Sequence, residues 1–328
     1  MTNRPDISVQ HGDIGPMEYL ARGGQATVHR LTSFRLPDVQ GELVLKKYEK
    51  GQGPPPHGLN AIVGIRNEME VSAKAKLDSL AAWPTRVVFD GGDLVGVLIP
   101  LIAGSYFQDM VLPSGKRTSN PRELQFLFID PRQASKLGYA PPSLSERFAI
   151  LRDLAFGLGM LHKNGVVFGD VNAKNALYRT TSEPTVMFVD CDAVRIRGSA
   201  AVVRQYHSPD WEPPEGGPGT IATDLYKLGL LVLRILSPAE FNSISRDPTR
   251  ADPVLDADGR TMLRRALGAD TKARPTAKEW VGYLRSAARG RPIIVASATG
   301  ATAPAPPAPL APAHGGWAKD AAGKWVRR

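Results

Sequence analysis

An aspartate and an asparagine, Asp170 and Asn175, stand five residues apart in the stretch VVFGDVNAKNALY (166–178). Apolar runs flank them, and a buried backbone carries such polar side chains only where they are solvated, hydrogen-bonded or bound to an ion. The carboxylate could act as a general base and the amide oxygen as a metal ligand. For an isolated D-x-x-x-x-N pattern, however, a polar loop between a helix and a strand is the better explanation. Other residues of the chain decide between the two.

A further carboxylate, Asp190, follows the apolar residues of VMFVDCDAV, and a fixed strand end suits an acid that binds a metal. Upstream, Lys46 lies in the strand pattern ELVLKKYE, and Gly23 and Gly24 lie in LARGGQATV. A glycine-rich turn between strands lets backbone N–H groups approach phosphates, and a nearby lysine can supply them with a positive charge. Taken singly, a plain hairpin and a solvent-facing lysine explain these residues more simply.

The helix expected at residues 59–80 carries two acids, Glu68 and Glu70, and either could orient Lys46 through an ion pair. We expect Glu68, because Glu70 would bring Lys74, one turn later, into the core. A phosphate loop, a lysine, metal-binding acids and a base are the parts that phosphoryl transfer from ATP needs. All of them occur here in a suitable order, which favours the catalytic interpretation over the simpler ones.

The elements that would position these residues divide the chain into four parts. A polar extension covers residues 1–16, and residues 17–102 show short strand patterns around one helix. Residues 103–290 are mostly helical in pattern, and residues 291–328 form an Ala/Pro-rich linker that ends in a tryptophan-containing stub.

Local signals place several elements inside these parts. Two adjacent glycines predict the turn of a hairpin at residues 85–100. Ser143 and Glu146 form a capping box that opens a long amphipathic helix, and the nearly all-apolar residues 223–237 predict a central core helix. The polar stretch 103–142 has no pattern that assigns an element.

Composition limits the class of protein. The chain has 328 residues, of which 42% are hydrophobic and 22% charged, as in ordinary globular proteins. Its one cysteine, Cys191, excludes an internal disulfide and suits a reducing compartment. No signal-peptide pattern opens the sequence and no apolar stretch is long enough to span a bilayer as a helix. We therefore expect a cytoplasmic protein without a membrane partner.

Charge and the C-terminal composition bear on partners. The net charge is +9, but the lysines and arginines are scattered and not interleaved with aromatic residues. We therefore expect a solvated basic surface and no nucleic-acid partner. In the terminal stub Trp317 and Trp325 stand eight residues apart beside basic residues, a pattern that could anchor a partner.

Several motifs together carry a family resemblance. LARGGQATV resembles a kinase Gly-rich loop, LVLK the V-A-I-K strand, and FGDVNAKN the H-R-D-x-x-x-x-N loop; DCD stands where D-F-G is expected. Later, PPE resembles A-P-E, TDLYKLG resembles the start of the following helix, and ARPTA supplies Arg274 as a partner for Glu215. Over about residues 17–290 the chain thus resembles the eukaryotic-type (Hanks-type) protein kinase superfamily. Its W-P and G-D-x-N signatures are similar to those of a bacterial Ser/Thr kinase-like branch.

The resemblance implies an α+β, bilobal, protein-kinase-like fold, with a β-rich N-lobe that holds one main helix and a mostly helical C-lobe. It implies ATP and Mg²⁺ or Mn²⁺ as cofactors, and transfer of the γ-phosphate to Ser/Thr hydroxyls of a protein substrate. By this resemblance Asp170 is the catalytic base, and Asn175 and Asp190 are the metal ligands. Lys46, with Glu68, holds the nucleotide.

The resemblance also implies a nucleotide pocket. Ile99 takes the gatekeeper position, and Pro100 lacks an N–H, so we expect the backbone of Leu101 and Ile102 to hold the adenine. The residues expected to bind the nucleotide, including the three that would sandwich adenine (Val28, Val44 and Leu177), are Ala21, Gly23, Gly24, Val28, Val44, Lys46, Glu68, Ile99, Leu101, Ile102 and Leu177.

Departures from the family pattern leave alternatives open. Asn172 stands where protein-serine kinases usually carry a lysine on the γ-phosphate, and Lys174 could substitute for it. Cys191 and Asp192 replace the last two residues of D-F-G. An active kinase is the first hypothesis, since the lysine, the base and both metal ligands are present. The alternative is a pseudokinase, a nucleotide-binding scaffold that signals through conformation and its C-terminal tail. A small-molecule kinase is a third, disfavoured by the PPE segment.

Gly169 replaces the arginine that precedes the catalytic aspartate in many protein kinases. That arginine receives a phosphate on the activation segment. A phosphate on Ser199, Tyr206 or Ser208 would lack this partner, so we expect activity without prior phosphorylation.

Overall fold

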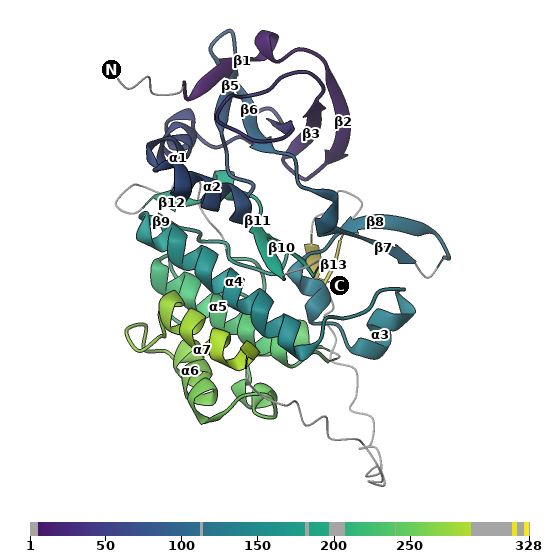
Figure 1. The fold of residues 1–328 in the computed structure, drawn as a ribbon, viewed down its shortest axis with the longest axis vertical. Helices are drawn as coiled ribbons and strands as arrows, with labels where there is room; N and C mark the ends of the chain where they lie inside the picture. Colours follow the sequence, from purple (N-terminus) through teal and green to yellow (C-terminus); the bar gives the residue numbers. More distant parts are fainter. Residues whose placement is uncertain are drawn as a thin grey trace. The chain divides into compact units, whose positions relative to one another are not determined.

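The structure is a computed structural model. The residues that it describes are 6–111, 114–180, 184–196, 207–239, 241–289, 317–319 and 325–327. The contacts of the chain separate two compact units, residues 1–290 and residues 291–328. The first unit combines a six-stranded sheet with several helices, so the expected α+β class is confirmed (Figure 1).

The six-stranded sheet has the order β1-β5-β6-β4-β3-β2, and its neighbours pair antiparallel except for β1 with β5. The strands are β1 (Ser8–Gln10), β2 (Met17–Arg22), β3 (Ala26–Leu31), β4 (Leu43–Tyr48), β5 (Arg86–Asp90) and β6 (Asp93–Pro100). Because β1 joins this sheet and the next turn buries Ile14, the sheet begins earlier than the expected boundary at residue 17.

Glycines shape two places in this sheet. Gly91 and Gly92, at φ 57° and 100°, form the expected turn between β5 and β6, where both positions of the favoured hairpin turn need positive φ. Gly96 pairs with Lys47 where β6 runs beside β4, and a Cβ there would collide with the backbone carbonyl oxygen of Lys46. The absent side chain at Gly96 therefore lets the strand that carries Lys46 approach its neighbour.

Two helices replace the single helix expected after β4: α1 (Pro56–Glu68) and α2 (Val71–Leu80). The chain is extended at Met69, where α1 ends. The guanidinium of Arg66, fully buried, donates to both carboxylate oxygens of Asp78 in α2 at 2.7 Å. In one continuous helix these two residues would lie about 18 Å apart along the axis. The break thus allows an ion pair that helical periodicity does not reveal.

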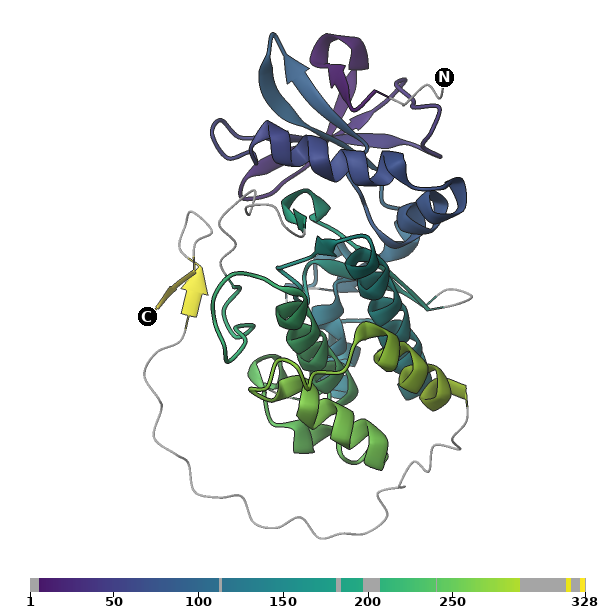
Figure 2. The same ribbon diagram turned by 90° about the vertical axis from the view of Figure 1, so that its left-hand side faces the viewer.

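Helices make up most of the remainder of the first unit: α4 (Leu144–Lys163), α5 (Ile221–Leu236), α6 (Ala257–Leu267) and α7 (Ala277–Arg289) (Figure 2). The capping box of Ser143 and Glu146 at the start of α4 is confirmed. Most residues of α5 are buried, as its apolar sequence predicts. The main hydrophobic core joins α4, α5, α6 and α7. It also includes Phe168, Val171 and Cys191 from the loops that follow β9 and β11.

The polar stretch 103–142, which has no predicted element, contains a hairpin of β7 (Phe107–Val111) and β8 (Arg117–Pro121), followed by α3 (Pro131–Lys136). A small separate apolar cluster of Met110, Ala134 and Tyr139 holds them together. Four short strands follow, in two antiparallel pairs that flank the central loops: β9 (Val166–Val167) with β12 (Arg195–Ile196), and β10 (Ala176–Arg179) with β11 (Thr185–Phe188).

The second unit contains two described strands, β13 (Trp317–Lys319) and β14 (Trp325–Arg327), which pair antiparallel. The linker predicted before them lies outside the described residues, so its extended form and the partner-binding role of Trp317 and Trp325 stay predictions. Across the part of the chain that is described, none of the helices has the length and apolarity needed to cross a bilayer.

Candidate active site

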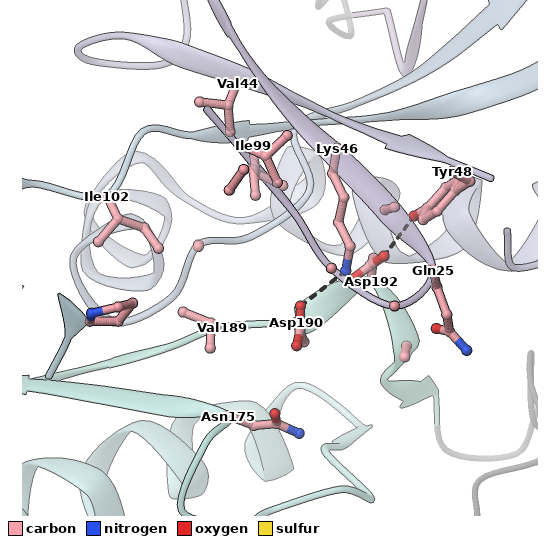
Figure 3. Close-up of a pocket in the computed structure, with 18 of the residues that line it drawn as sticks. Gln25, Val44, Lys46, Tyr48, Ile99, Ile102, Asn175, Val189, Asp190 and Asp192 are labelled. Carbon is pink, nitrogen blue, oxygen red and sulfur yellow. Dashed lines mark hydrogen bonds and ion pairs between the residues drawn. The ribbon is translucent and has the colours of Figure 1, made fainter. Parts of the chain in front are cut away.

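A cleft of about 900 Å³ lies between the sheet and the helical part of the first unit (Figure 3). The turn between β2 and β3, strand β4 and the end of β6 form one side, and the loops that follow β9 and β11 form the other. Twelve of the residues predicted for the site line this cleft: Ala21, Gly23, Gly24, Val28, Val44, Lys46, Ile99, Leu101, Ile102, Asp170, Asn175 and Asp190. The other four predicted residues do not line the cleft: Glu68, Asn172, Lys174 and Leu177.

The turn between β2 and β3 covers one end of the cleft. The Gly23 N–H donates to the Ala26 carbonyl at 2.8 Å and closes the turn. A Cβ on Gly24 would meet no heavy atom within 4 Å, so packing inside the protein does not require this glycine. Its exposed backbone faces the cleft, which suits close approach by a ligand.

Apolar side chains form the inner wall. Val28 and Val44 lie on neighbouring strands of the sheet, as predicted. Leu177 was expected to lie opposite them, but it is buried in β10, where it pairs with Met187. Val189, which directly precedes Asp190, lines the cleft instead. Its place next to the strand-ending acid is the signal that could have identified it.

The segment after β6 provides backbone groups at the edge of the sheet. The Leu101 N–H donates to the Glu42 carbonyl at 2.8 Å, so this N–H is already bound to the neighbouring strand segment. In an antiparallel pair, backbone groups of successive residues point alternately toward and away from the neighbouring strand. The Pro100 carbonyl, at the last paired residue of β6, therefore faces away from β4. Ile102 lies beyond this pairing and lines the cleft, and the role of its N–H stays a prediction.

Lys46 meets two carboxylates at the centre of the cleft (Figure 3). Its Nζ lies 3.0 Å from Asp190 Oδ1 and 2.8 Å from Asp192 Oδ1. The Tyr48 hydroxyl donates to Asp192 Oδ2 at 2.6 Å. Burial disfavours the charged lysine, but Asp192 and Asp190 outweigh burial and hold the pKa of Lys46 above its usual value. Lys46 is thus a cation held in place at the wall of the cleft.

Glu68, the predicted partner of Lys46, lies elsewhere. It is the last residue of α1 and is exposed, as is Glu70 beyond it. Within the described residues, the ion pairs of Lys46 are those with Asp190 and Asp192. The helix ends at this point, and the two aspartates already occupy the ammonium. The prediction of Glu68 as partner is therefore corrected to Asp190 and Asp192.

Asp170 lies in a loop held by amide side chains. Asn175 Nδ2 donates to the Asp170 backbone carbonyl and to its Oδ2, both at 2.9 Å. Asn172 Oδ1 accepts from the N–H groups of Lys174 at 2.8 Å and Asn175 at 3.2 Å. Asn172 thus shapes the loop from inside. Lys174 is exposed, and neither residue belongs to the described wall of the cleft.

Ser208 completes the surroundings of Asp170. Its hydroxyl donates to Asp170 Oδ1 at 3.1 Å, and Asn172 Nδ2 donates to the Ser208 hydroxyl at 3.3 Å. A hydroxyl therefore already occupies one oxygen of the proposed base. This contact shows that the Asp170 carboxylate is accessible to a hydroxyl donor from the segment that follows β12.

Helix α5 supports this loop from below with two charged residues. Asp224 accepts from the backbone N–H groups of Phe168 and Gly169, each at 2.8 Å. Lys227 Nζ donates to the Gly169 carbonyl at 2.7 Å and lies 3.9 Å from Asp170 Oδ1. Burial lowers the pKa of Lys227, while Asp170 and Asp224 act against that change. No pattern in the sequence singles out Lys227, because the residues of its helix are nearly all apolar.

The predicted metal ligands form an oxygen donor set. The Asp190 side chain is 59% exposed and faces the cleft. Asn175 uses its Nδ2 on Asp170, which leaves its Oδ1 to face elsewhere. One carboxylate and one amide oxygen fit Mg²⁺, which takes few protein ligands and completes its shell with phosphates and water. A group of three or more His, Cys, Asp or Glu side chains in metal-binding geometry does not occur among the described residues.

Comparison with known proteins adds a distant kinase-like relationship. No protein-family model matches the chain. Protein kinase YegI of Escherichia coli O157:H7 is 23% identical over 331 residues, which cover 86% of this chain and 46% of that protein. Protein kinase YegI of Escherichia coli strain K12 is 23% identical over 315 residues, covering 81% of this chain and 43% of that protein. The chain thus spans less than half the length of these relatives.

Proposed function

We propose that this chain is an ATP-dependent protein kinase of the eukaryotic type, from a bacterial Ser/Thr kinase-like branch, acting in the cytoplasm on a protein substrate. In this proposal the N-lobe extends to residue 102 and includes β1, residues 103–290 are the C-lobe, and the tail binds a partner through its tryptophans. One observation carries the proposal: Lys46, the pair Asp170 and Asn175, and Asp190 come from three separate segments and line one cleft.

The chemistry follows from the geometry of these residues. Lys46, held between two carboxylates, would place its charge on the phosphates of ATP. Asp190 and Asn175 would hold Mg²⁺ or Mn²⁺, which neutralises charge on the β- and γ-phosphates. Asp170 would orient the attacking hydroxyl and receive its proton, because its Oδ1 accepts a hydrogen bond from the Ser208 hydroxyl.

Two contacts support a protein substrate with a Ser or Thr hydroxyl. The segment that carries Ser208 runs beside Asp170, and it is braced farther along by the ion pair of Glu215 with Arg274 at 2.6 Å. A braced segment next to the base offers an extended backbone a place to dock. A small-molecule kinase would not need this platform.

The pseudokinase remains the second candidate, and a specific observation favours it. Asn172 replaces the lysine usual at that position and supports the loop, while Lys174 is exposed outside the described wall. The γ-phosphate therefore lacks a second lysine from this loop. A pseudokinase would bind ATP through the same cleft without transferring phosphate.

A transfer assay separates the two candidates. Purified protein is incubated with γ-labelled ATP, Mg²⁺ and a library of Ser-, Thr- and Tyr-containing peptides, and Asp170→Asn is the matched variant. An active kinase labels Ser or Thr peptides, and Asp170→Asn reduces labelling by about a hundredfold or more while it still binds ATP. Equal labelling by both proteins would contradict the role of Asp170, and ATP binding without labelling would favour the pseudokinase.

A further inference from the structure

The second aspartate of the D-C-D motif has no place in the proposed chemistry, yet it makes the shorter of the two ion pairs of Lys46. We infer that Asp192 is the residue that positions Lys46, in place of an acid on the helices after β4. This inference rests on the proposed function, because it concerns how the nucleotide-binding lysine is held.

The two aspartates differ in how firmly they are fixed. Both carboxylate oxygens of Asp192 are engaged, Oδ1 by Lys46 at 2.8 Å and Oδ2 by the Tyr48 hydroxyl at 2.6 Å, and its side chain is 7% exposed. The Asp190 side chain is 59% exposed, and its described ion pair is the one with Lys46 at 3.0 Å. A buried carboxylate with both oxygens bound is held in place, whereas the exposed one is free to turn toward a metal.

Local geometry explains why the chain brings both acids to one lysine. Asp190 adopts a left-handed backbone conformation, with φ 56° and ψ 37°, and it directly precedes the short 3-10 helix Cys191–Ala193. This reversal returns Asp192 to the cleft, and the buried Cys191 packs in the main core between them. On β4, Lys46 and Tyr48 are two residues apart and share one face of the strand, so they hold the same carboxylate.

The helices that follow β4 provide no competing acid. Glu68 and Glu70 are exposed at the junction of α1 and α2. The buried cation of α1, Arg66, is bound by Asp38 and Asp78, so this helix is anchored by a network separate from Lys46. The position of Lys46 therefore depends on its own strand and on the D-C-D turn, and not on where α1 lies.

The two aspartates would therefore have different roles: Asp190 would bind the metal, and Asp192 would hold Lys46. If Asp190 held a metal, Lys46 would lose one of its two partners, and Asp192 would keep the ammonium in the cleft. Without Asp192, the lysine has Asp190 as its remaining carboxylate partner among the described residues. Lys46 and the metal would then compete for Asp190, and nucleotide binding would need more Mg²⁺.

Asp192→Asn tests this competition directly, with the exposed Asp93→Asn as the matched control. Calorimetry measures the Kd for ATP without metal and over a range of Mg²⁺ concentrations, and unfolding is monitored for each protein. We expect Asp192→Asn to raise the Mg²⁺ concentration for half-maximal ATP affinity by about tenfold, as the loss of a charge-assisted hydrogen bond predicts. The metal-free Kd should change less, because a role confined to folding would move both values together.

Two further variants make the outcome decisive. Tyr48→Phe removes one hydrogen bond from Asp192 and should shift the Mg²⁺ dependence in the same direction by a smaller factor; it carries the test if Asp192→Asn fails to fold. Glu68→Gln addresses the helix directly. The inference is overturned if Asp192→Asn and Tyr48→Phe both match Asp93→Asn in Mg²⁺ dependence, or if Glu68→Gln produces the shift instead. These experiments measure ATP binding and not phosphate transfer. A protein that binds Mg–ATP without transferring phosphate would therefore contradict the proposed activity and not this inference.

Discussion

Arg274 and Glu215 form a bidentate ion pair across 59 residues of sequence, with Nη1 2.7 Å from Oε1 and Nη2 2.6 Å from Oε2. The pair was expected from the PPE and ARPTA motifs, and it is confirmed. Arg274 also donates to the backbone carbonyls of Ala222 and Gly268. One buried guanidinium thus joins the PPE segment, the start of α5 and the end of α6.

This pair predicts a pH-dependent loss of stability. The hydrogen bonds from Arg274 hold the pKa of Glu215 below its usual value of 4.5, so the folded state favours the carboxylate. Its stabilisation is complete above the pKa of the unfolded chain and disappears as the pH falls through the lower folded value. Glu215→Gln should therefore reduce the free energy of unfolding by about 2 kcal/mol at pH 7 and by much less near pH 3.

Denaturant melts of wild type and Glu215→Gln across this pH range provide the measurement. Glu212→Gln, an exposed acid three residues earlier, is the control. A difference between Glu215→Gln and wild type that stays constant from pH 7 to pH 3 would show that the carboxylate charge does not act through Arg274.

Replacement by alanine should have different effects at two glycines, on ATP affinity at Gly24 and on thermal stability at Gly96. Gly24→Ala adds a methyl group that meets no protein atom within 4 Å, so the melting temperature should not change. The methyl would stand between the loop backbone and the phosphates, and the Kd for Mg–ATP should rise by roughly three- to tenfold. Gly96→Ala would clash with the Lys46 carbonyl and should lower the melting temperature by several degrees. Thermal melts with and without Mg–ATP measure both effects, and a destabilised Gly24→Ala with unchanged ATP affinity would contradict the assignment of the loop.

We expect replacement of Lys227 by methionine to lower the rate of phosphate transfer without lowering the stability of the fold. Burial lowers its pKa, which shows that the folded protein disfavours the buried charge. Lys227→Met relieves this burial but leaves the Gly169 carbonyl without its donor, so the melting temperature should change little. The Gly169 carbonyl and Asp170 would lose their cation, so kcat should fall by roughly tenfold to a hundredfold. The KM for ATP should stay the same, because Lys227 is not part of the cleft wall.

Steady-state kinetics and thermal melts of Lys227→Met test this. Lys278→Met, on the exposed side of α7, is the matched control. A wild-type kcat in Lys227→Met would show that this lysine is only a structural anchor of α5.

Local patterns predicted the elements that depend on neighbouring residues. The turn at Gly91 and Gly92 and the capping box of Ser143 and Glu146 need only a few consecutive positions, and both are present. The residues brought into one cleft could be predicted because the family resemblance fixes their order. Twelve of the sixteen predicted site residues line the cleft, whereas lining residues such as Tyr48, Val189 and Asp192 were not predicted.

Contacts between residues that are far apart in the sequence could not be predicted from local patterns. The break between α1 and α2 depends on the reach of Arg66 to Asp78, and no periodicity shows it. The partners of Lys46 are Asp190 and Asp192 rather than Glu68, because Asp190, a left-handed residue 144 positions from the lysine, redirects the chain. Lys227 lies in a helix that reads as apolar, and its role depends on the loop above it.

Phosphorylation of Ser208 should inhibit phosphate transfer. Its hydroxyl donates to Asp170, so a phosphate at this residue would place about two negative charges against the proposed base. Gly169 has no side chain to receive a phosphate, and its N–H and carbonyl are bound to Asp224 and Lys227. Of the three hydroxyl residues considered, Ser199 and Tyr206 lie outside the described residues.

We therefore expect phosphatase-treated protein to transfer phosphate at the rate of untreated protein. Ser208→Ala removes one hydrogen bond from Asp170 and should reduce kcat severalfold, as expected for loss of one orienting contact. Ser208→Glu brings a second carboxylate to Asp170 and should abolish transfer, while ATP binding persists because Ser208 is not in the cleft wall. Transfer rates and ATP affinities of the three preparations measure this. A phosphatase-treated protein that regains activity only after rephosphorylation, or a fully active Ser208→Glu, would show that the segment is controlled by phosphate and not by its contact with Asp170.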